Sequence, residues 1–344
     1  MAEIESYGSA HSELRRFEVR AMGTRNVLLV SGLPERELRE AAQEAFETIE
    51  RLEGALSKFL PSSDLSHLNL LGASQPVRVG KDLLFLLLRA REAWEATGGA
   101  FDPAVGPLLE AWGFVGLEGR VPAPREVETA RSLAGMANVE VDPASGTASL
   151  ARPGVSLDLG GIAKGYAVDV AADGLAARGV TVGAVLSGRS SARVWGRPPG
   201  EEAWRFDLVH PADPEGSLRT VLVETGAVSA SSASERKFVR GGRTYGHVID
   251  PRTGAPARGV LSAAVWTESA LIGDVLSTAL LVLGREGLEE GGAAERLLER
   301  WKRPGSEARA SVVLAVENPR LWGGFEVVER HFGKPGFREV RPEG

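Results

Sequence analysis

The N-terminal part of the chain carries apolar residues at the spacing of an amphipathic helix. After SGLP, apolar positions alternate in steps of four and three: Leu38, Ala42, Ala45, Ile49, Leu52 and Leu56. Such a stripe lies on one side of a helix, which we expect to pack on a sheet. Two strand-like segments, RFEVRAM and NVLLVS, precede it with GTR between them. A second helix is predicted from Lys81 to about Ala96, because TGG follows as a stop signal.

The rest of the chain contains runs of strands with helices between the runs. VEVDPASGTASL predicts a hairpin, VSLDL a strand, and Ile162–Arg178 a helix that ends at Gly179. Further strands are predicted at VTVGAVLSG, WRFDLVH, LRTVLVE, GVLSAAVWT, ASVVLAVE and FEVVERHF, and helices at SALIGDVLSTALLVLG and Glu286–Trp301. Since strands and helices do not alternate strictly, we expect the α+β class. We predict one domain over residues 16–332, between a flexible arm at 1–15 and a flexible tail at 333–344.

Composition narrows the classes of function. The 344 residues are 43% hydrophobic, which is enough for a large core, and the net charge of −6 argues against nucleic-acid binding. Without cysteine the chain has no disulfide, thiol nucleophile or zinc–thiolate site. The first fifteen residues lack an apolar signal-peptide core, and the run LLFLLL is too short to span a bilayer. We therefore expect a cytoplasmic protein without membrane insertion.

The stretch DLGGIAKGYAVD, Asp158 to Asp169, places two glycines directly before a helix with one lysine. Successive glycines let a backbone approach a ligand closely, and the N–H groups that begin a helix favour anions. A phosphate is therefore expected at Gly160 to Ala163, with Lys164 as its counter-charge. The stretch fits neither the G-x-G-x-x-G nor the Walker A pattern. The alternative is a tight strand-to-helix turn with a surface lysine.

A second candidate is the oxygen-bearing face of the helix GDVLSTALLVLG. Asp274 lies four residues before Thr278, so both side chains leave one face, and Ser277 is adjacent. A carboxylate in such apolar surroundings needs a partner, and Mg²⁺ takes oxygen ligands of this kind. The alternative is an acid early in a helix, stabilised by the helix dipole.

Two further segments carry candidate chemistry. In TYGHVIDPRTGAP, His247 stands at a strand end beside the turn signal DPRTG, where it can act as a general base or simply bond a turn carbonyl. In TGGAFDPAVGPLLEAWGF, Asp102 lies between Phe101 and Pro103 in a glycine-rich loop. That loop is either the edge of a site for a flat ring or a loop that packs one aromatic.

The order of these motifs resembles the ApbE family, the FAD:protein FMN transferases. The resemblance runs from AMGT at Ala21–Thr24 to VLG at Val282–Gly284. Between them lie LSKFLPSSDLSHLN, GGAFDPAVGPLLEAWGF, DLGGIAKGYAVD, HVIDPRTGAP and GDVLSTALLVLG. The resemblance implies two interlocked lobes of largely antiparallel sheet with packed helices and a flavin cleft between them.

The resemblance also implies an activity and a site. The activity is Mg²⁺-dependent transfer of FMN from FAD to a threonine or serine hydroxyl of an acceptor protein, with release of AMP. An FAD pyrophosphatase and a non-catalytic flavin-binding protein are the alternatives. By resemblance, His247 is the catalytic base, and the metal ligands are Ala163, Asp274, Ser277 and Thr278. The flavin site is lined by Met22, Phe59, Ala100, Phe101, Asp102, Gly160, Tyr166 and Ile249.

Two positions depart from the family pattern. Arg189, in SGRSSARVWG, stands where relatives often have the second glycine of a loop. Ser277 stands where many relatives have a carboxylate. The first change is expected either to narrow the cleft or to add a phosphate contact, and the second to weaken metal binding.

Overall fold

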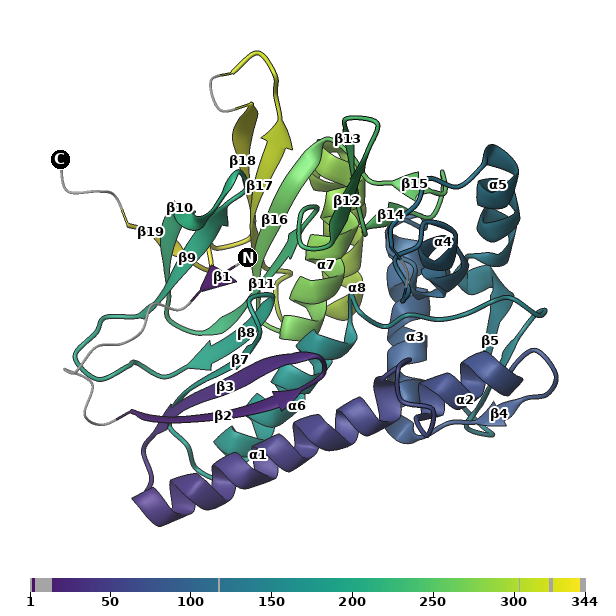
Figure 1. The fold of residues 1–344 in the computed structure, drawn as a ribbon. Coiled ribbons are helices and arrows are strands. Elements are labelled where there is room, and N and C mark those ends of the chain that lie inside the picture. The colour runs from purple at the N-terminus through teal and green to yellow at the C-terminus, as the bar shows by residue number, and fades with distance from the viewer. Residues whose placement is uncertain (1, 4–13, 117, 303, 322–323, 341–344) are drawn as a thin grey trace.

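The computed structural model describes residues 2–3, 14–116, 118–302, 304–321 and 324–340. Its largest element is an eight-stranded sheet at the centre of Figure 1, in which every neighbouring pair is antiparallel. In spatial order its strands are β18 (Phe325–Phe332), β17 (Ala310–Glu317), β16 (Val260–Thr267), β11 (Gly226–Ser232), β8 (Ser191–Trp195), β7 (Val182–Ser187), β3 (Thr24–Ser31) and β2 (Arg15–Ala21). The α+β class with largely antiparallel sheet is confirmed.

A second, four-stranded sheet covers one face of the large sheet. Its strands, in spatial order, are β1 (Ala2–Glu3), β9 (Trp204–His210), β10 (Asp213–Val223) and β19 (Arg338–Glu339). Trp204 and Phe206 of this sheet share one buried cluster with Val194 and Trp266 of the large sheet. The interface is therefore a sheet-on-sheet core.

Helices cover the opposite face of the large sheet. They are α1 (Glu35–Leu56), α6 (Ala163–Ala177) and α7 (Ala270–Leu283). Because side chains alternate along a strand, Val185 faces the helices while its neighbour Ala184 faces the second sheet. All six positions of the predicted stripe on α1 are buried, as the spacing predicted. No helix in the described part of the chain is long and apolar enough to cross a membrane.

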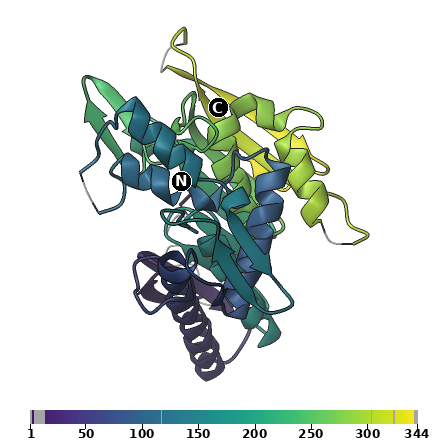
Figure 2. The same ribbon diagram turned by 90° about the vertical axis from the view of Figure 1, so that its right-hand side faces the viewer.

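Residues between α1 and α6 form a second lobe, on the right of Figure 1. It consists of α2 (Asp64–Leu71), α3 (Lys81–Ala96), a 3-10 turn (Pro103–Val105), α4 (Gly106–Ala111), α5 (Pro124–Leu133) and the small sheet of β4 (Val77–Arg78), β6 (Thr147–Leu150) and β5 (Val139–Asp142). The predicted hairpin is β5–β6, and the predicted second helix is α3. Figure 2 shows this lobe from its own side.

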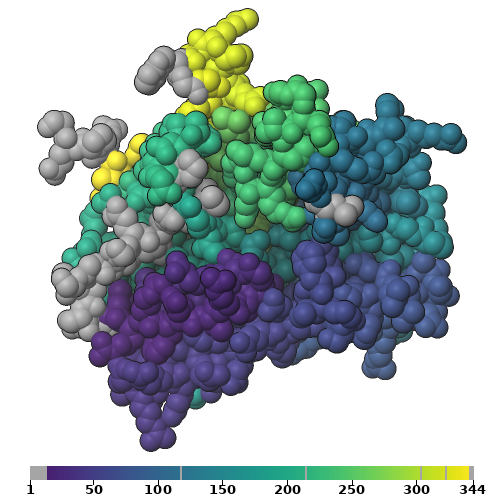
Figure 3. Space-filling view, viewed as in Figure 1, coloured from purple at the N-terminus to yellow at the C-terminus, as the bar shows by residue number. Residues whose placement is uncertain are grey.

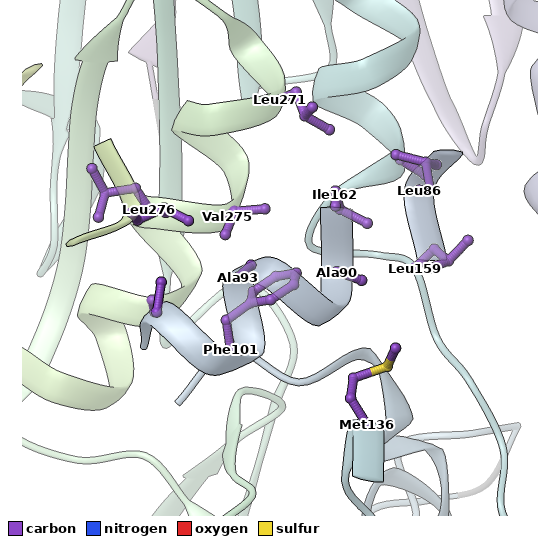
Figure 4. Close-up of a cluster of buried hydrophobic side chains, with 14 of the residues drawn as sticks. Leu86, Ala90, Ala93, Phe101, Met136, Leu159, Ile162, Leu271, Val275 and Leu276 are labelled. Atoms are coloured by element: carbon purple, nitrogen blue, oxygen red, sulfur yellow. The ribbon is translucent and has the colours of Figure 1, made fainter. Parts of the chain in front are cut away.

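The lobes interlock through segments that cross between them. Two hairpins between β11 and β16 reach α4: β12 (Lys237–Arg240) with β13 (Arg243–Gly246), and β14 (Ile249–Asp250) with β15 (Ala255–Pro256). The indole of Trp112 donates to the carbonyl of Gly254 at 2.8 Å. At the junction, Phe101 points toward Ile162 and Val275, which belong to the same buried cluster (Figure 4). The two lobes thus share a core.

Two local predictions were wrong. VSLDL is not a strand, because the side chain of Asn69 satisfies both the N–H and the C=O of Leu157 in place of a strand partner. The helix expected at Glu286–Trp301 is shortened to α8 (Ala293–Trp301), preceded by a 3-10 turn at Gly284–Leu288. The segment before α8 contains several glycines, which disfavour a helix, whereas the interior of α8 contains none.

Both terminal segments that were expected to be flexible contain described residues that pair with strands. In the described part of the tail, β19 pairs with β10, and the N–H of Gly336 donates to Ser311 Oγ at 3.0 Å. These bonds hold the described part of the tail, which extends to Val340, against the two sheets. In the expected arm, Ala2–Glu3 pairs with β9 and Arg15 begins β2. Residues 4–13 of that arm lie outside the described residues.

Candidate functional site

A cleft of about 390 Å³ lies between the lobes. In Figure 3 the surface is hollowed between the green β12–β13 hairpin and the purple to blue elements below it. Eleven of the expected site residues line this cleft: Met22, Phe59, Ala100, Phe101, Asp102, Gly160, Lys164, His247, Ile249, Asp274 and Thr278. They come from the β2–β3 turn, the second lobe, the start of α6, β14 with its preceding residues, and α7. Segments far apart in the sequence therefore meet at one place.

The glycine turn before α6 is shaped by Asp158. One carboxylate oxygen accepts the N–H of Gly160 at 2.7 Å, and the other pairs with Lys58 Nζ at 2.6 Å. The ammonium of Lys58 also lies 5.1 Å from the ring centroid of Phe59. These contacts fix the turn and leave the start of α6 at the cleft, with Lys164 Nζ 3.3 Å from the carbonyl of Gly160.

The second glycine of the turn allows α6 and α7 to meet closely. A Cβ on Gly161 would lie 3.1 Å from Thr278 Oγ1 and 3.2 Å from the ring of Phe101. Such distances are tighter than ordinary contacts, so a side chain would displace one of these neighbours. Gly161 thus brings the glycine turn, the Thr278 hydroxyl and the ring of Phe101 together.

Asp274 is a buried acid held in place by hydrogen bonds. Its carboxylate accepts from the N–H of Gly165 at 2.7 Å and from Ser191 Oγ at 2.6 Å. Burial raises the pKa of Asp274, while the charge of Lys164 and these hydrogen bonds act in the opposite direction. The acid therefore needs nearby positive charge to remain ionised.

His247 lies at the cleft on the segment between β13 and β14. Burial lowers the pKa of its imidazole, and the nearby Glu235 carboxylate acts against this effect. Its Nδ1 is buried and has no hydrogen-bond partner among the described residues. The neighbouring DPRTG turn is held by Asp250, whose carboxylate accepts from the N–H of Arg252 at 3.0 Å. The turn therefore has a support of its own in Asp250, and burial favours the neutral form of His247, which is the form that can accept a proton.

Asp102 is the second buried acid of the cleft. Only 8% of its surface is exposed, and burial raises its pKa to about 7, although backbone N–H groups, including that of Ala104 at 2.8 Å, stabilise the carboxylate. The same bond to Ala104 makes Asp102 the cap of the 3-10 turn at Pro103–Val105. The loop therefore presents a carboxyl group that titrates near neutral pH.

Apolar residues line the rest of the cleft. Met22 has a positive φ of 55° and Gly23 follows at 70°, the pair of positive φ angles that a tight hairpin turn between twisted strands requires. This turn fixes Met22 at the cleft. Phe59 is 70% exposed at its edge, and Ile249 is buried on β14. A second cavity of about 310 Å³ shares Met22 and Phe59 with the cleft and is also lined by Ala163.

Three expected site residues do not line the cleft, and one of them, Ala163, lines the adjoining cavity instead. Tyr166 points away from it: its hydroxyl donates to Asp82 Oδ1 at 2.7 Å, and its ring packs against Phe85. Ser277 is buried, with its hydroxyl 2.8 Å from that of Ser231. Arg189 is likewise not among the described residues that line the cleft, whereas its neighbour Ser190 is.

Several residues at the cleft were missed. They include Lys58, Asp158, Ser231, Glu235 and Arg236. Lys58 adjoins Phe59 in its motif, and Asp158 opens DLGGIAKGYAVD, so both were within quoted segments. Their pairing spans a hundred residues of sequence and gives no local signal. Among the described residues, no group of three or more histidine, cysteine, aspartate or glutamate side chains could hold a metal ion.

Comparison with known proteins identifies the family. A model described as the ApbE family matches residues 22–297, which is most of the chain. The chain belongs to the ApbE family. Solved ApbE structures have the same fold. The ApbE protein of Thermotoga maritima superposes with a TM-score of 0.77 at 30% identity, covering 92% of this chain and 96% of that one.

Relatives in the ApbE family carry the name of an enzyme. A Rhodobacter capsulatus protein named FAD:protein FMN transferase is 31% identical over 88% of this chain, which spans 57% of that protein's length. A Vibrio cholerae protein of the same name is 32% identical over 69% of this chain and 72% of its own. The family and the enzyme class expected from the motifs are confirmed.

Proposed function

We propose that this ApbE family member transfers FMN from FAD to a threonine or serine hydroxyl of an acceptor protein, in a reaction that requires Mg²⁺. The acceptor oxygen forms a bond to the phosphorus of the FMN half. The bond from that phosphorus to the bridging oxygen breaks, and the bridging oxygen leaves with AMP. The hydroxyl proton passes to a base on the enzyme, so the product is a phosphoester.

One observation carries this proposal: three separate elements direct phosphate-chemistry groups into one cleft. They are the start of α6 with Lys164, the α7 side chains of Asp274 and Thr278, and His247. Cleavage of a phosphoanhydride depends chiefly on positioning and on stabilisation of charge. A helix start with a lysine, an oxygen-bearing helix face and a neutral histidine meet that need.

The apolar side of the cleft suits the flavin ring, and the α6 side suits the phosphates. Met22, Phe59, Phe101 and Ile249 offer flat or apolar surface, and Asp102 offers a polar edge. The adjoining cavity of about 310 Å³ gives room for the adenylate half of FAD. FAD then lies with its pyrophosphate beside Lys164, where the two cavities meet.

The oxygen groups beside the α6 turn fit Mg²⁺. They are the Asp274 carboxylate, the Thr278 hydroxyl and the Ala163 carbonyl, and Mg²⁺ takes such ligands together with substrate phosphates and water. Bound there, Mg²⁺ would neutralise phosphate charge and draw electron density from the scissile bond. Ser277 does not fit this set, because its hydroxyl is buried against Ser231.

His247 is the proposed base. A hydroxyl is a weak nucleophile until a base takes its proton during attack. Burial keeps the imidazole of His247 neutral at lower pH than usual, which is the form that accepts a proton. Lys164 lies near enough for its charge to lower the pKa of His247 further.

Mass spectrometry tests the proposal. The purified protein is incubated with FAD, MgCl₂ and candidate acceptor proteins, and both FMN adducts and AMP are measured. An adduct on a threonine or serine, with equimolar AMP, is the expected result; replacing that residue with alanine or omitting Mg²⁺ should abolish it. Free FMN with AMP and no adduct indicates hydrolysis, and bound FAD without either product indicates a binding protein; both contradict the proposal.

A further inference from the structure

Asp169 closes the stretch DLGGIAKGYAVD, and none of the roles above uses it. It lies on α6 with 9% of its surface exposed. Its carboxylate accepts four hydrogen bonds: from Ser269 Oγ at 2.6 Å, from the N–H groups of Ala270 at 2.9 Å and Leu271 at 3.0 Å, and from Arg193 at 3.0 Å. Three of these donors begin α7, and the fourth lies on β8. A buried acid of α6 thus binds two other elements of the site.

The bonds to Ala270 and Leu271 cap the start of α7 from a different helix. The first N–H groups of a helix have no partner within it, and the helix start favours negative charge. Among the described residues, the side chain of Ser269 accepts a bond from the N–H of Ile272, at 3.4 Å. Asp169 therefore determines where α7 begins relative to α6.

The same two helices are joined again one helical turn further on. Gly165 lies four residues before Asp169, and Asp274 lies four residues after Ala270. The N–H of Gly165 donates to Asp274 at 2.7 Å. A Cβ on Gly165 would lie 2.2 Å from the carbonyl of Ala270, so the helices meet with no room for a side chain. A shift of α7 along α6 would therefore break both contacts.

Strand β8 holds both acids from the other side. Ser191 Oγ donates to Asp274 at 2.6 Å, and Arg193 donates to Asp169 at 3.0 Å. Residues two apart on a strand share a face, so one face of β8 carries both contacts. Asp274 of α7 is thus bound by α6 and β8. Asp169 of α6 is bound in the same way by α7 and β8, one helical turn away.

We propose that Asp169 is a positioning residue for flavin transfer. It anchors the start of α7 so that Asp274 and Thr278 face the glycine turn of α6 at the distance that one pyrophosphate and its metal ion require. The inference rests on the proposed function, because it concerns the same cleft. In this inference the carboxylate of Asp169 fixes the geometry of the site through its bonds to α7 and β8, and it does not contact the substrate.

The variant Asp169→Asn tests this inference against the control Asp173→Asn. Asp173 pairs with the same Arg193 at 2.9 Å, but its side chain is 68% exposed and it accepts no bond from α7. Groups that orient metal ligands are worth about 10–100-fold in activity or metal affinity. We expect Asp169→Asn to lower kcat by about that factor and to raise the Mg²⁺ concentration for half-maximal rate about tenfold. KM for FAD and the Asp173→Asn variant should change by less than about threefold.

A second readout does not depend on transfer. Flavin fluorescence titrations with FAD, with and without MgCl₂, measure how much Mg²⁺ strengthens FAD binding. In Asp169→Asn that Mg²⁺ effect should be reduced, while FAD affinity without Mg²⁺ stays near the wild-type value. If wild-type protein transfers no FMN, the proposed function fails, and this titration still tests Asp169.

All variants are assayed well below their melting temperatures, so that a loss of stability is not mistaken for a change in the geometry of the site. If Asp169→Asn does not fold, Arg193→Gln takes its place, because it leaves the α7 cap and removes only the β8 arm. It should show a smaller change of the same kind. A variant that melts earlier but keeps the wild-type kcat and the wild-type Mg²⁺ dependence would reduce Asp169 to a structural residue and overturn the inference.

Discussion

The acid at the flavin edge of the cleft gives a prediction with a defined pH window. Asp102 is almost fully buried, and burial raises its pKa from the ordinary 3.8 to about 7. The perturbation is Asp102→Asn, which keeps the size of the side chain and one oxygen for the N–H of Ala104 but cannot ionise. Unfolding is measured for both proteins between pH 5 and 8.

The sign follows from the raised pKa. Between pH 4 and 7 the unfolded chain has lost the Asp102 proton while the folded protein keeps it, so rising pH favours unfolding. The contribution is complete below the unfolded pKa and is lost once the pH passes about 7. One pKa unit corresponds to about 1.4 kcal/mol, so the whole loss is about 4 kcal/mol. About 2 kcal/mol of it falls between pH 5 and 7.

Urea denaturation gives the free energy of unfolding at each pH. We expect the stability of Asp102→Asn relative to wild type to increase by about 2 kcal/mol from pH 5 to 7 and to level off above about pH 8. Asp142→Asn is the control. Hydrogen bonds to Ser145 and Ala144 lower the pKa of Asp142, so its titration ends below this window. Parallel pH profiles for wild type and Asp102→Asn would refute the assignment of a raised pKa to Asp102.

Three further changes test the remaining parts of the site. Asp274→Asn should lower Mg²⁺-dependent transfer by about 10–100-fold and remove the Mg²⁺ effect on FAD binding; wild-type rates at low Mg²⁺ would contradict its role. His247→Ala should bind FAD normally and transfer FMN about 10²–10⁴-fold more slowly, whereas His210→Ala, outside the cleft, should transfer at the wild-type rate. Gly161→Ala should weaken FAD binding because the new Cβ meets Thr278; the control Gly174→Ala, with open space on α6, should be neutral or stabilising by about 0.5–1 kcal/mol.

The fold was predictable where the sequence of a single element shows which of its faces is buried. The stripe on α1 needs only its own spacing, and α3 ends at glycines that adopt positive φ, Gly98 at 60° and Gly99 at 81°. VSLDL failed for the opposite reason. Its composition suits a strand, but the partner of Leu157 is the side chain of Asn69, 88 residues earlier. Periodicity carries no information about such a partner.

The same limit separates the expected residues that lie at the cleft from those that do not. The place of Gly160 and Lys164 at the cleft could be predicted from local chemistry, because a glycine turn and a helix start depend on neighbouring residues in the sequence. Tyr166 shares their motif, yet Asp82 of the second lobe binds its hydroxyl and turns it away from the cleft. A motif shows which residues stand together in the sequence. The direction of each side chain depends on partners that only the folded chain supplies.

Burial and the charge of Lys164 both shift the protonation of the acids and the histidine at the cleft. Burial raises the pKa of Asp102 and of Asp274 and lowers that of His247, so it favours the uncharged form of all three groups. The charge of Lys164 lowers the pKa of both Asp274 and His247. For Asp274 this favours the carboxylate that a metal ion needs, and for His247 it favours the neutral base. In the proposed function, one lysine at the start of α6 thus favours the charged form of the acid assigned as a metal ligand and the neutral form of the histidine assigned as the base.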